Sequence, residues 1–477
     1  MVSVMSAAIA PPPASTLHLN DVHSGLNRTA IAGLLQPRSL DQACAAVRDC
    51  ARLGRSTIAV GARHAMGGQQ FLSGGWLLDT SGLDRIVDFD PERGLITVEA
   101  GVQWPALLAW LARHPGNVRG WTIRQKQTGA DGFSLGGAFA SNIHGRGLAF
   151  APFVEDVESI MLIDHRGDAR IADRERNAEW FALAAGGYGL FGLVARLTLR
   201  LVPRTVLRRE VALLRVGELM PHLQAAVADG CTYGDFQFAI DPASDDFLDL
   251  GIASCYRPLA DAAPDPSPRH LGGEDFAHLL RLAHVDPSRA FAEYAAFYLA
   301  TDGQRYGSDS QQAGVYLEGY HAGVDAALGH CGSEMITELY VPRARLAEFM
   351  VAAADALRRH HAQPIYGTVR LVCAERSSML AWAREDWACI VFNLHVRHDP
   401  AGRAAAAAAF RALIDEALAR GGSYYLTYHR HATRDQVEAA YPQFREFLRR
   451  KRELDPDRRW DSDWFRHHEA LFARAGA

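Results

Sequence analysis

A glycine-rich segment around two basic side chains is the first candidate for chemistry in this chain. Residues 57–71 open with a short apolar run, typical of a buried strand, and continue into a loop with Arg63 and His64 at its centre. Because glycine has no Cβ, the backbone N–H groups of such a loop can turn toward an anion and approach it closely. A pyrophosphate would fit there, with His64 in reach of whatever it carries. The alternative is a tight turn with a surface histidine.

A second segment of small residues, 128–147, ends in the pair His144-Gly145. Small residues at this density indicate that something flat or bulky lies on the backbone, and a plain surface loop is the alternative. Two such segments predict a long ligand with a phosphate in its middle. The usual dinucleotide and mononucleotide patterns, G-x-G-x-x-G and G-x-x-x-x-G-K-[ST], do not account for them, so the ligand would be held in a different way.

Histidines near the C-terminus form a third candidate. His429 and His431 follow a predicted strand over residues 423–428, and on a strand they share a face opposite Tyr428. An H-x-H pair could bind a metal with His467 or His468, but no carboxylate or cysteine is spaced to complete the set, so we expect no metal. A surface or structural role is the alternative for His431.

The predicted strands and helices that must position these groups differ in length between the first and second parts of the chain. Up to Pro203 the pattern predicts short strands and short helices, with a helix after Ser39. These strands are 57–60, 76–79, 85–89, 95–100, 157–164 and 192–201. Beyond residue 206 the strands and helices are longer, which favours an α+β domain with helices over an antiparallel or mixed sheet. The long strands are 233–240, 334–341, 365–372 and 388–396, and the long helices are 276–299, 344–360 and 404–419.

The composition excludes several classes of protein. Hydrophobic residues make up 48% of the 477 residues and the formal net charge is −5, so no strong field attracts nucleic acid or a membrane surface. Seven scattered cysteines without a C-x-x-C pair favour reduced thiols and a cytoplasmic location. The first residues predict a flexible arm rather than a signal peptide, and no apolar run reaches the length of a membrane span.

Five motifs in order resemble the vanillyl-alcohol oxidase/p-cresol methylhydroxylase (PCMH-type) flavoprotein superfamily. The resemblance covers roughly residues 30–205 and rests on residues 60–68, 78–83, 98–102, 133–137 with His144-Gly145, and 189–192. The tail, at residues 424–428 and 451–464, is similar to the aldonolactone, alditol and decaprenylphosphoryl-ribose oxidase branch.

The resemblance implies an α+β fold in which FAD extends between two subdomains and meets a substrate domain whose central sheet is covered by helices. It divides the chain into a flexible arm (1–29), a PCMH-type FAD-binding domain (30–205), a substrate domain (206–422) and a C-terminal segment that returns to the FAD domain (423–477). His64 matches a histidine that many members link covalently to the flavin. The neighbourhood of a second, cysteinyl link in some relatives, residues 128–131, has no cysteine here, so one covalent bond is expected. The implied cofactor-binding residues are Val60, Gly61, Ala62, Arg63, His64, Ala65, Gly129, Ser134, Gly137, Ala138, Ser141, Asn142, Gly145, Gly192 and Val194.

For catalysis, the resemblance implies hydride transfer from a substrate C–H to flavin N5 while a base takes the hydroxyl proton. Tyr428 lies where the sugar-oxidising relatives have a lysine, and a neutral phenol lacks that charge, so the same substrate does not follow. His429 or His431 could restore a basic group. His144 matches a histidine near the flavin. Arg370 resembles an arginine of the alditol oxidases, with a salt bridge as its alternative role.

Asn393 and His395 alternate on a predicted strand and either line the pocket or face solvent. The resulting hypothesis is an FAD-dependent oxidoreductase that oxidises a small alcohol (a polyol, sugar or lactone) and passes electrons to oxygen or another acceptor. The alternative is a flavin-binding sensor or carrier without turnover. We expect no nucleic-acid partner.

Overall fold

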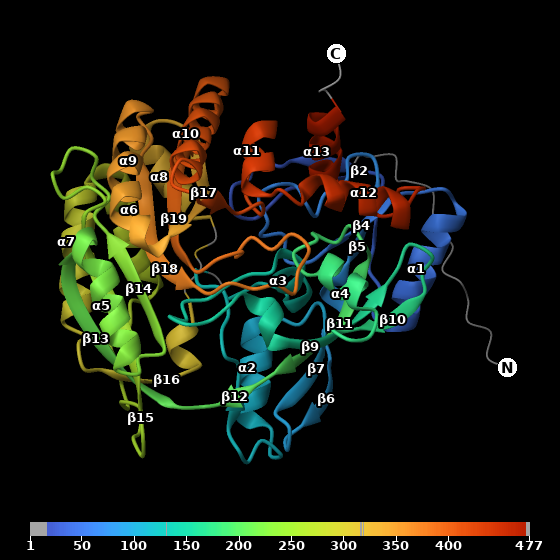
Figure 1. Cartoon of the computed structure of the whole chain (residues 1–477), viewed down its shortest axis with the longest axis horizontal. Coiled ribbons are helices and arrows are strands. Elements are labelled where there is room, and N and C mark those ends of the chain that lie inside the picture. Colours follow the sequence, from blue (N-terminus) through green and yellow to red (C-terminus); the bar gives the residue numbers. More distant parts are fainter. Residues whose placement is uncertain (1–16, 130, 315–316, 318, 474–477) are drawn as a thin grey trace.

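The computed structural model describes residues 17–129, 131–314, 317 and 319–473 (Figure 1). Residues 1–16 of the predicted flexible arm, and Ala130, lie outside the described residues. The rest of that arm, residues 17–29, is tied into the fold, because β1 (Leu17–Leu19) pairs with β2 (Thr29–Ile31). The buried Asp21 carboxylate accepts hydrogen bonds from the N–H groups of Ser24 and Gly25, which fixes the turn between these strands.

A small parallel sheet carries the first glycine-rich segment. Its strand order is β3 (Gly33–Leu35), β5 (Trp76–Asp79), β4 (Thr57–Val60), and α1 (Leu40–Arg52) connects β3 to β4. The Ser39 side chain caps α1 by accepting from the Gln42 N–H. Apolar side chains of β4, including Ile58 and Val60, are buried. The chain therefore leaves the core at the end of β4 and continues into residues 61–71, which we call the glycine loop.

A five-stranded antiparallel sheet completes the N-terminal part. Its strand order is β10 (Ala169–Ala172), β9 (Val157–Ile163), β11 (Leu193–Arg200), β7 (Leu95–Glu99), β6 (Ile86–Asp90). Three helices border its core: α2 (Trp104–Arg113), α3 (Leu135–Ser141) and α4 (Ala178–Ala184). The second segment of small residues contains α3. A Cβ on Gly136 would lie 2.7 Å from the Ala100 Cβ, so part of the need for small residues comes from packing within the chain.

The C-terminal part is built on an eight-stranded antiparallel sheet (Figure 1). Its strand order is β16 (Arg305–Gly307), β13 (Val206–Arg215), β15 (Leu250–Leu259), β14 (Tyr233–Phe238), β18 (Pro364–Val372), β19 (Trp387–Arg397), β17 (Gly332–Pro342), β20 (Ser423–Tyr424). One layer of contacting helices consists of α5 (Val216–Ala228), α9 (Leu346–Arg359) and α10 (Pro400–Leu418). A second group consists of α6 (Gly273–Val285), α7 (Pro287–Leu299) and α8 (His321–Leu328). The predicted α+β class is confirmed.

The single helix predicted over residues 276–299 is wrong, because the chain breaks it into α6 and α7. Pro287 has no N–H to continue α6, and Asp286 instead caps α7 by accepting from the Arg289 N–H. The break leaves His284 in the last turn of α6, beside the large sheet.

Strand β17 presents two different faces, because successive side chains of a strand alternate. Its register with β19 is regular from Gly332 to Pro342, and Glu334 lies opposite His395. Glu334 and Glu338 therefore share a face with Ile336, whereas Met335 and Leu339 are buried on the other side.

The predicted strand over residues 423–428 is shorter in the structure. Only β20 pairs with β17, so the tail begins as an edge strand of the large sheet. Residues 425–432, the return loop, then cross to the N-terminal part, where the Thr427 and Leu426 carbonyls accept from the Met66 N–H and the Gln69 side chain. The tail ends in α11 (Arg434–Ala440), α12 (Phe444–Leu454) and α13 (Asp463–Ala473).

Two further observations concern the described part of the chain. A short pair of strands, β8 (Trp121–Thr122) and β12 (Val202–Pro203), lies next to the passage into the large sheet. Among the helices of the described residues, none combines the length and the apolar character needed to cross a bilayer.

Candidate functional site

One cavity of about 520 Å³ joins the two parts of the chain. On one side its wall consists of the glycine loop after β4 and the segment around α3. On the other side it consists of residues of β14, β17, β18 and β19, and the return loop closes it with Thr427 and Tyr428. The sequence-predicted residues that line it are Val60, Gly61, Ala62, Arg63, His64, Ala65, Gly129, Ser134, Gly137, Ser141, Gly192, Val194, His144, Arg370, Asn393 and Tyr428.

The glycine loop offers backbone donors to this cavity. Arg63 adopts a left-handed conformation (φ 61°), and its carbonyl accepts from the Val22 N–H at 3.1 Å. Within the described residues, the N–H groups of Ala62, Arg63 and Ala65 have no acceptor. Buried amides are rarely left without one, so these groups fit an anion such as a pyrophosphate.

The loop also lies very close to the second segment. A Cβ on Gly61 would be 2.3 Å from the Ser134 Oγ, the residue that precedes α3. The absence of a side chain at Gly61 therefore allows the two segments to form one continuous wall.

His64 lies on this wall and stacks on Phe133, with ring centroids 4.1 Å apart and an interplanar angle of 22°. Burial, followed by the influence of the neighbouring His23, lowers the pKa of His64 to about 4. The imidazole is therefore neutral at pH 7, and a neutral imidazole is the form in which a ring nitrogen can act as a nucleophile.

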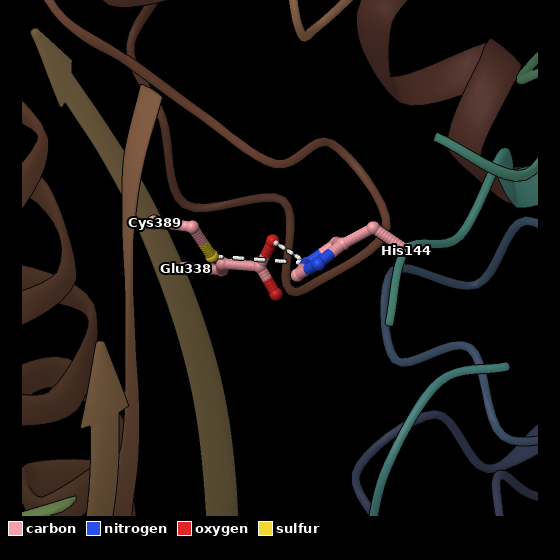
Figure 2. A group of neighbouring side chains, drawn as sticks. All are labelled: His144, Glu338 and Cys389. Carbon is pink, nitrogen blue, oxygen red and sulfur yellow. Dashed lines mark hydrogen bonds and ion pairs between the residues drawn. The ribbon is translucent and has the colours of Figure 1, made fainter. Parts of the chain in front are cut away.

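His144 links the N-terminal part to the large sheet. Figure 2 shows it pointing toward Glu338 of β17 and Cys389 of β19. Its Nδ1 donates to the Gly145 carbonyl at 2.9 Å, and its Nε2 lies 2.9 Å from the Glu338 Oε1. Both nitrogens face oxygen atoms, so the ring is held from both sides.

The carboxylate of Glu338 collects several hydrogen bonds in a fully buried position. Burial alone would raise its pKa, but the charge and hydrogen bond of His144 and the hydrogen bond from Tyr340 outweigh burial, so the pKa is lowered. Burial raises the pKa of Cys389 well above its ordinary value, so this residue is a thiol. His144, Glu338 and Cys389 are close enough together to hold a metal ion. Both Glu338 oxygens already accept from protein donors, so the group fits a hydrogen-bond network better.

Tyr428 belongs to the same network. Its Oη donates to the Glu338 Oε2 at 3.2 Å, and its ring meets Tyr425 edge-on at 5.7 Å. Burial, and then the charge of Glu338, raise the pKa of Tyr428 well above its ordinary value, so the phenol keeps its proton. Because Tyr428 also lines the cavity, it can pass a proton between a ligand there and Glu338.

Arg370 and Asn393 reach the same cavity from neighbouring strands. Arg370, on β18, donates through Nη2 to the Thr128 Oγ1 of the second segment of small residues (128–147), so it joins the two sides of the cavity. Asn393 lies on β19 opposite Ile336. The prediction for Arg370 rested on the family resemblance and that for Asn393 on its place in a predicted strand, and both residues line the cavity.

Four predicted residues do not line this cavity. His429 was expected near the reacting atoms, but it lies beside a second, smaller cavity with His431 and Met66, where its Nε2 is 3.3 Å from the Ser24 Oγ. Burial lowers the pKa of His429 to about 3. The return loop is not a strand at His429, so the alternation of side chains along a strand could not predict where His429 lies.

The other three support the wall from behind. Ala138 is part of the buried core, and Asn142 caps α3 in a left-handed conformation while its Oδ1 accepts from the Val154 N–H. Gly145 orients His144 through its carbonyl. A Cβ on Gly145 would also lie 2.9 Å from the Lys126 carbonyl, so close packing requires glycine there.

Sequence reasoning missed Glu338, although a signal was present. A glutamate inside a predicted apolar strand is rarely buried without a partner. The partner, His144, lies 194 positions away, and no local pattern could identify it.

Comparison with known proteins agrees with this geometry. Residues 31–172 match a family described as an FAD binding domain. The chain is 26% identical over 247 residues to an L-gulono-1,4-lactone dehydrogenase of Mycobacterium tuberculosis (52% of this chain, 54% of the relative). It is 27% identical over 176 residues to a D-arabinono-1,4-lactone oxidase of Eremothecium gossypii (35% and 31%). It is 23% identical over 442 residues to a decaprenylphosphoryl-beta-D-ribose oxidase of Mycolicibacterium smegmatis (88% and 90%).

The chain thus spans about half the length of the first of these relatives. The predicted resemblance to the vanillyl-alcohol oxidase/p-cresol methylhydroxylase superfamily, on its aldonolactone and decaprenylphosphoryl-ribose oxidase branch, is confirmed. The FAD binding match contains the glycine loop, His64 and α3. The N–H groups of Ala62, Arg63 and Ala65, which have no acceptor among the described residues, and the cavity beside them fit such a cofactor.

Proposed function

We propose that this chain is an FAD-dependent oxidoreductase that oxidises a C–OH group of a small alcohol, namely a polyol, a sugar or a lactone. The observation that carries the proposal is the cavity that joins the glycine loop, which lies within the FAD binding match, to the Tyr428–Glu338–His144 network. The names of the relatives, which refer to lactones and a ribose, support the same class of substrate.

When bound, FAD supplies an acceptor for the hydride of the substrate C–H bond at its N5 atom. The protein must then remove the hydroxyl proton. Tyr428 would accept that proton at Oη while its own proton passes to the Glu338 Oε2, which lies 3.2 Å away. The lowered pKa of Glu338 keeps the carboxylate ionised before the reaction, so an oxygen can take up the proton, but it also makes Glu338 a weaker base than an ordinary carboxylate.

His144 and Arg370 would position this relay. His144 holds the Glu338 carboxylate from the side opposite Tyr428, through Oε1. Arg370 brings a positive charge to the cavity wall and donates to Thr128. That charge would favour the developing alkoxide of the substrate.

We further propose that His64 holds the flavin covalently through its 8-methyl carbon. The support is that His64 lines the cavity, that its imidazole is neutral at pH 7, and that it belongs to the loop matched by the FAD binding domain family. The two sheets of the N-terminal part would then be the two subdomains of a PCMH-type fold, with FAD between them. A cytoplasmic location fits the seven free thiols.

The test is anaerobic reduction of the purified yellow protein. Polyols, sugars and aldonolactones are added one at a time, and bleaching of the flavin by at least one of them is expected. A flavin that dithionite reduces but no member of the panel bleaches would contradict turnover and favour a flavin-binding carrier or sensor. Parallel assays for peroxide and for reduction of a dye then identify the acceptor.

A further inference from the structure

A buried pair of opposite charges lies in the wall of the cavity and takes no part in the proposed reaction. Asp235 is on β14, and Arg146 belongs to the second segment of small residues (128–147). Both side chains line the cavity, although they are only 5% and 13% exposed. The Arg146 Nη1 lies 3.5 Å from the Asp235 Oδ1, so the two charges balance each other within the pair.

Each member of this pair has a polar atom without a hydrogen bond. The Asp235 Oδ1 and the Arg146 Nε are buried and have no hydrogen-bond partner among the described residues. Other atoms of the two side chains are held, because the Asp235 Oδ2 accepts from the Gln237 Nε2 at 3.2 Å and the Arg146 Nη2 donates to the Gln311 carbonyl. Buried polar atoms normally have partners, so this acceptor and this donor fit a ligand that supplies both kinds of group.

The register of the large sheet places Asp235 beside the reacting end of the cavity. Phe236 of β14 pairs with Val369 of β18. Asp235 therefore lies across from Arg370, and side chains at such opposite positions share a face of the sheet. The proposed function assigns Arg370 to the reacting oxygen, and β14 lies outside the FAD binding match, which ends at residue 172. A ligand group at Asp235 would thus belong to the substrate.

Helices α6 and α7 add apolar surface to the same cavity. Phe276 of α6 and Phe291 and Tyr294 of α7 line it. The Tyr294 ring stacks on that of Tyr298, with ring centroids 4.3 Å apart. Ligand sites commonly combine such surface with a few placed polar groups. The C–H groups of a carbon chain or ring can pack on these side chains while its hydroxyl groups reach the charged pair.

We propose that Asp235 and Arg146 bind two adjacent hydroxyl groups of the substrate and so select polyhydroxylated compounds over alcohols with a single hydroxyl group. One hydroxyl donates to the Asp235 carboxylate, and its neighbour accepts from the Arg146 guanidinium. An anion would meet the charge of Asp235, whereas a monohydric alcohol would leave both buried groups unpaired, which is costly. This selectivity rests on the proposed oxidation of an alcohol and narrows its substrate class.

The experiment compares pentitols with 1-pentanol, which has the same carbon chain and a single hydroxyl group. Ribitol, xylitol and arabinitol are titrated anaerobically into flavin-loaded protein whose flavin has been reduced, and calorimetry measures each Kd. Reduced flavin accepts no hydride, so the Kd reports binding alone. At least one pentitol is expected to bind the wild type about 100-fold more tightly than 1-pentanol does. Asp235→Asn and Arg146→Met should each weaken its binding by about 10- to 100-fold, the usual effect of losing a hydrogen bond to a charged group.

The matched control is Asp229→Asn, at an exposed position that does not line the cavity. It should bind the pentitols as the wild type does. Unchanged flavin and circular dichroism spectra would show that the Asp235 and Arg146 variants are folded. The comparison of alcohols on the wild type needs no variant, so it tests the selectivity even if a variant misfolds.

Three results would overturn the hydroxyl-binding role of the pair. The wild type could bind no pentitol, it could bind pentitols and 1-pentanol equally well, or Asp235→Asn could keep the full affinity for pentitols. Failure of the proposed function would look different. Tight, Asp235-dependent binding of a pentitol by a protein whose flavin no alcohol bleaches would support the pair and contradict the oxidation. Equal bleaching by pentitols and 1-pentanol, in the wild type and in Asp235→Asn, would do the reverse.

Discussion

Glu338 connects three side chains that come from distant parts of the chain. Its Oε1 accepts from His144 and Tyr340 and its Oε2 from Tyr428, so removing any donor leaves a buried carboxylate short of hydrogen bonds. The Tyr428 donor is the one that also reaches the cavity. The proposed reaction therefore depends on Tyr428 more than on the other two donors.

We predict that Tyr428→Phe lowers kcat by about 10² to 10⁴-fold, the usual contribution of a positioned acid–base group. Flavin content should not change, because the phenol is not part of the glycine loop. Stopped-flow reduction of the flavin by a substrate from the alcohol panel measures the effect. Tyr366→Phe, which changes another tyrosine of the cavity wall, is the matched control and should keep a near-normal rate. Equal rates for wild type and Tyr428→Phe would remove Tyr428 from the reaction.

We predict that His64→Ala releases its flavin on acid precipitation, whereas the wild-type pellet stays yellow. The reason is that only a covalent bond survives denaturation of the FAD site. His114→Ala, outside the glycine loop, should behave as the wild type does. A colourless wild-type pellet would contradict the covalent link and leave the FAD site itself unaffected.

At the level of single residues, the sequence predicted the glycine loop well and the network poorly. Gly61, Arg63 and His64 are neighbours in the chain, so a local pattern could single them out, and all three line the cavity. Glu338 and His144 meet only because β17 lies beside the second glycine-rich segment, and no spacing records that contact. His429 was misplaced because the predicted strand over residues 423–428 ends at Tyr424.

Among the elements, the glycine loop and the return loop depend on each other. A Cβ on Gly67 would lie 2.5 Å from the Tyr428 carbonyl, and the Met66 N–H donates to the Thr427 carbonyl. The loop proposed to bind the cofactor and the loop that carries the proposed acid–base group therefore touch through their backbones. Neither can shift without moving the other.

We predict that Gly67→Ala destabilises the protein by about 1–3 kcal/mol, as overpacking commonly does, and also lowers kcat. The added methyl group would push the return loop and displace Tyr428. Urea unfolding and flavin reduction measure the two effects. Gly217→Ala, in α5, is the control, because a Cβ there meets nothing within 4 Å. If both variants behaved alike, the contact between the loops would not matter.

Strands were predicted correctly where the local pattern decides the structure, and wrongly where contacts with distant parts of the chain decide it. Strands with clean alternation, such as β11, were predicted to within a residue or two. The segment Tyr424-Tyr-Leu-Thr-Tyr428 also favours a strand, yet it leaves the sheet after the Tyr425 N–H, which donates to the Glu338 carbonyl. From Leu426 on, its carbonyls bond to the glycine loop instead. Tertiary contacts outweigh strand propensity there.

For the whole molecule, buried histidines couple stability to pH. Burial lowers the pKa of His468 to about 3, whereas an unfolded chain titrates it near its ordinary value of 6.5. Below pH 6.5 the His468 side chain of the unfolded chain binds a proton, whereas the buried side chain of the folded protein stays neutral. The free energy of unfolding therefore falls as pH falls from 6.5 toward 3, by about 1.4 kcal/mol per pH unit for each such histidine.

We predict that His468→Phe reduces the slope of the unfolding free energy against pH, between pH 6.5 and pH 5, by the equivalent of about one bound proton. Urea unfolding at several pH values measures the slope. Asp156, whose pKa burial raises to about 6, acts in the opposite direction, so the difference between variant and wild type isolates His468. His278→Phe, at an exposed position, is the control. An unchanged slope in His468→Phe would contradict the prediction.

Strand β17 also places two carboxylates at a fixed separation along the cavity wall. Glu338 and Glu334 lie on the same face, four residues apart in a register without bulges, which corresponds to about 13 Å along the strand. A single sugar or lactone ring at Tyr428 would be too short to reach Glu334. Activity that rises with chain length in a series of linear alcohols, and that Glu334→Gln flattens, would mean that substrates are selected by length as well as by the group that reacts.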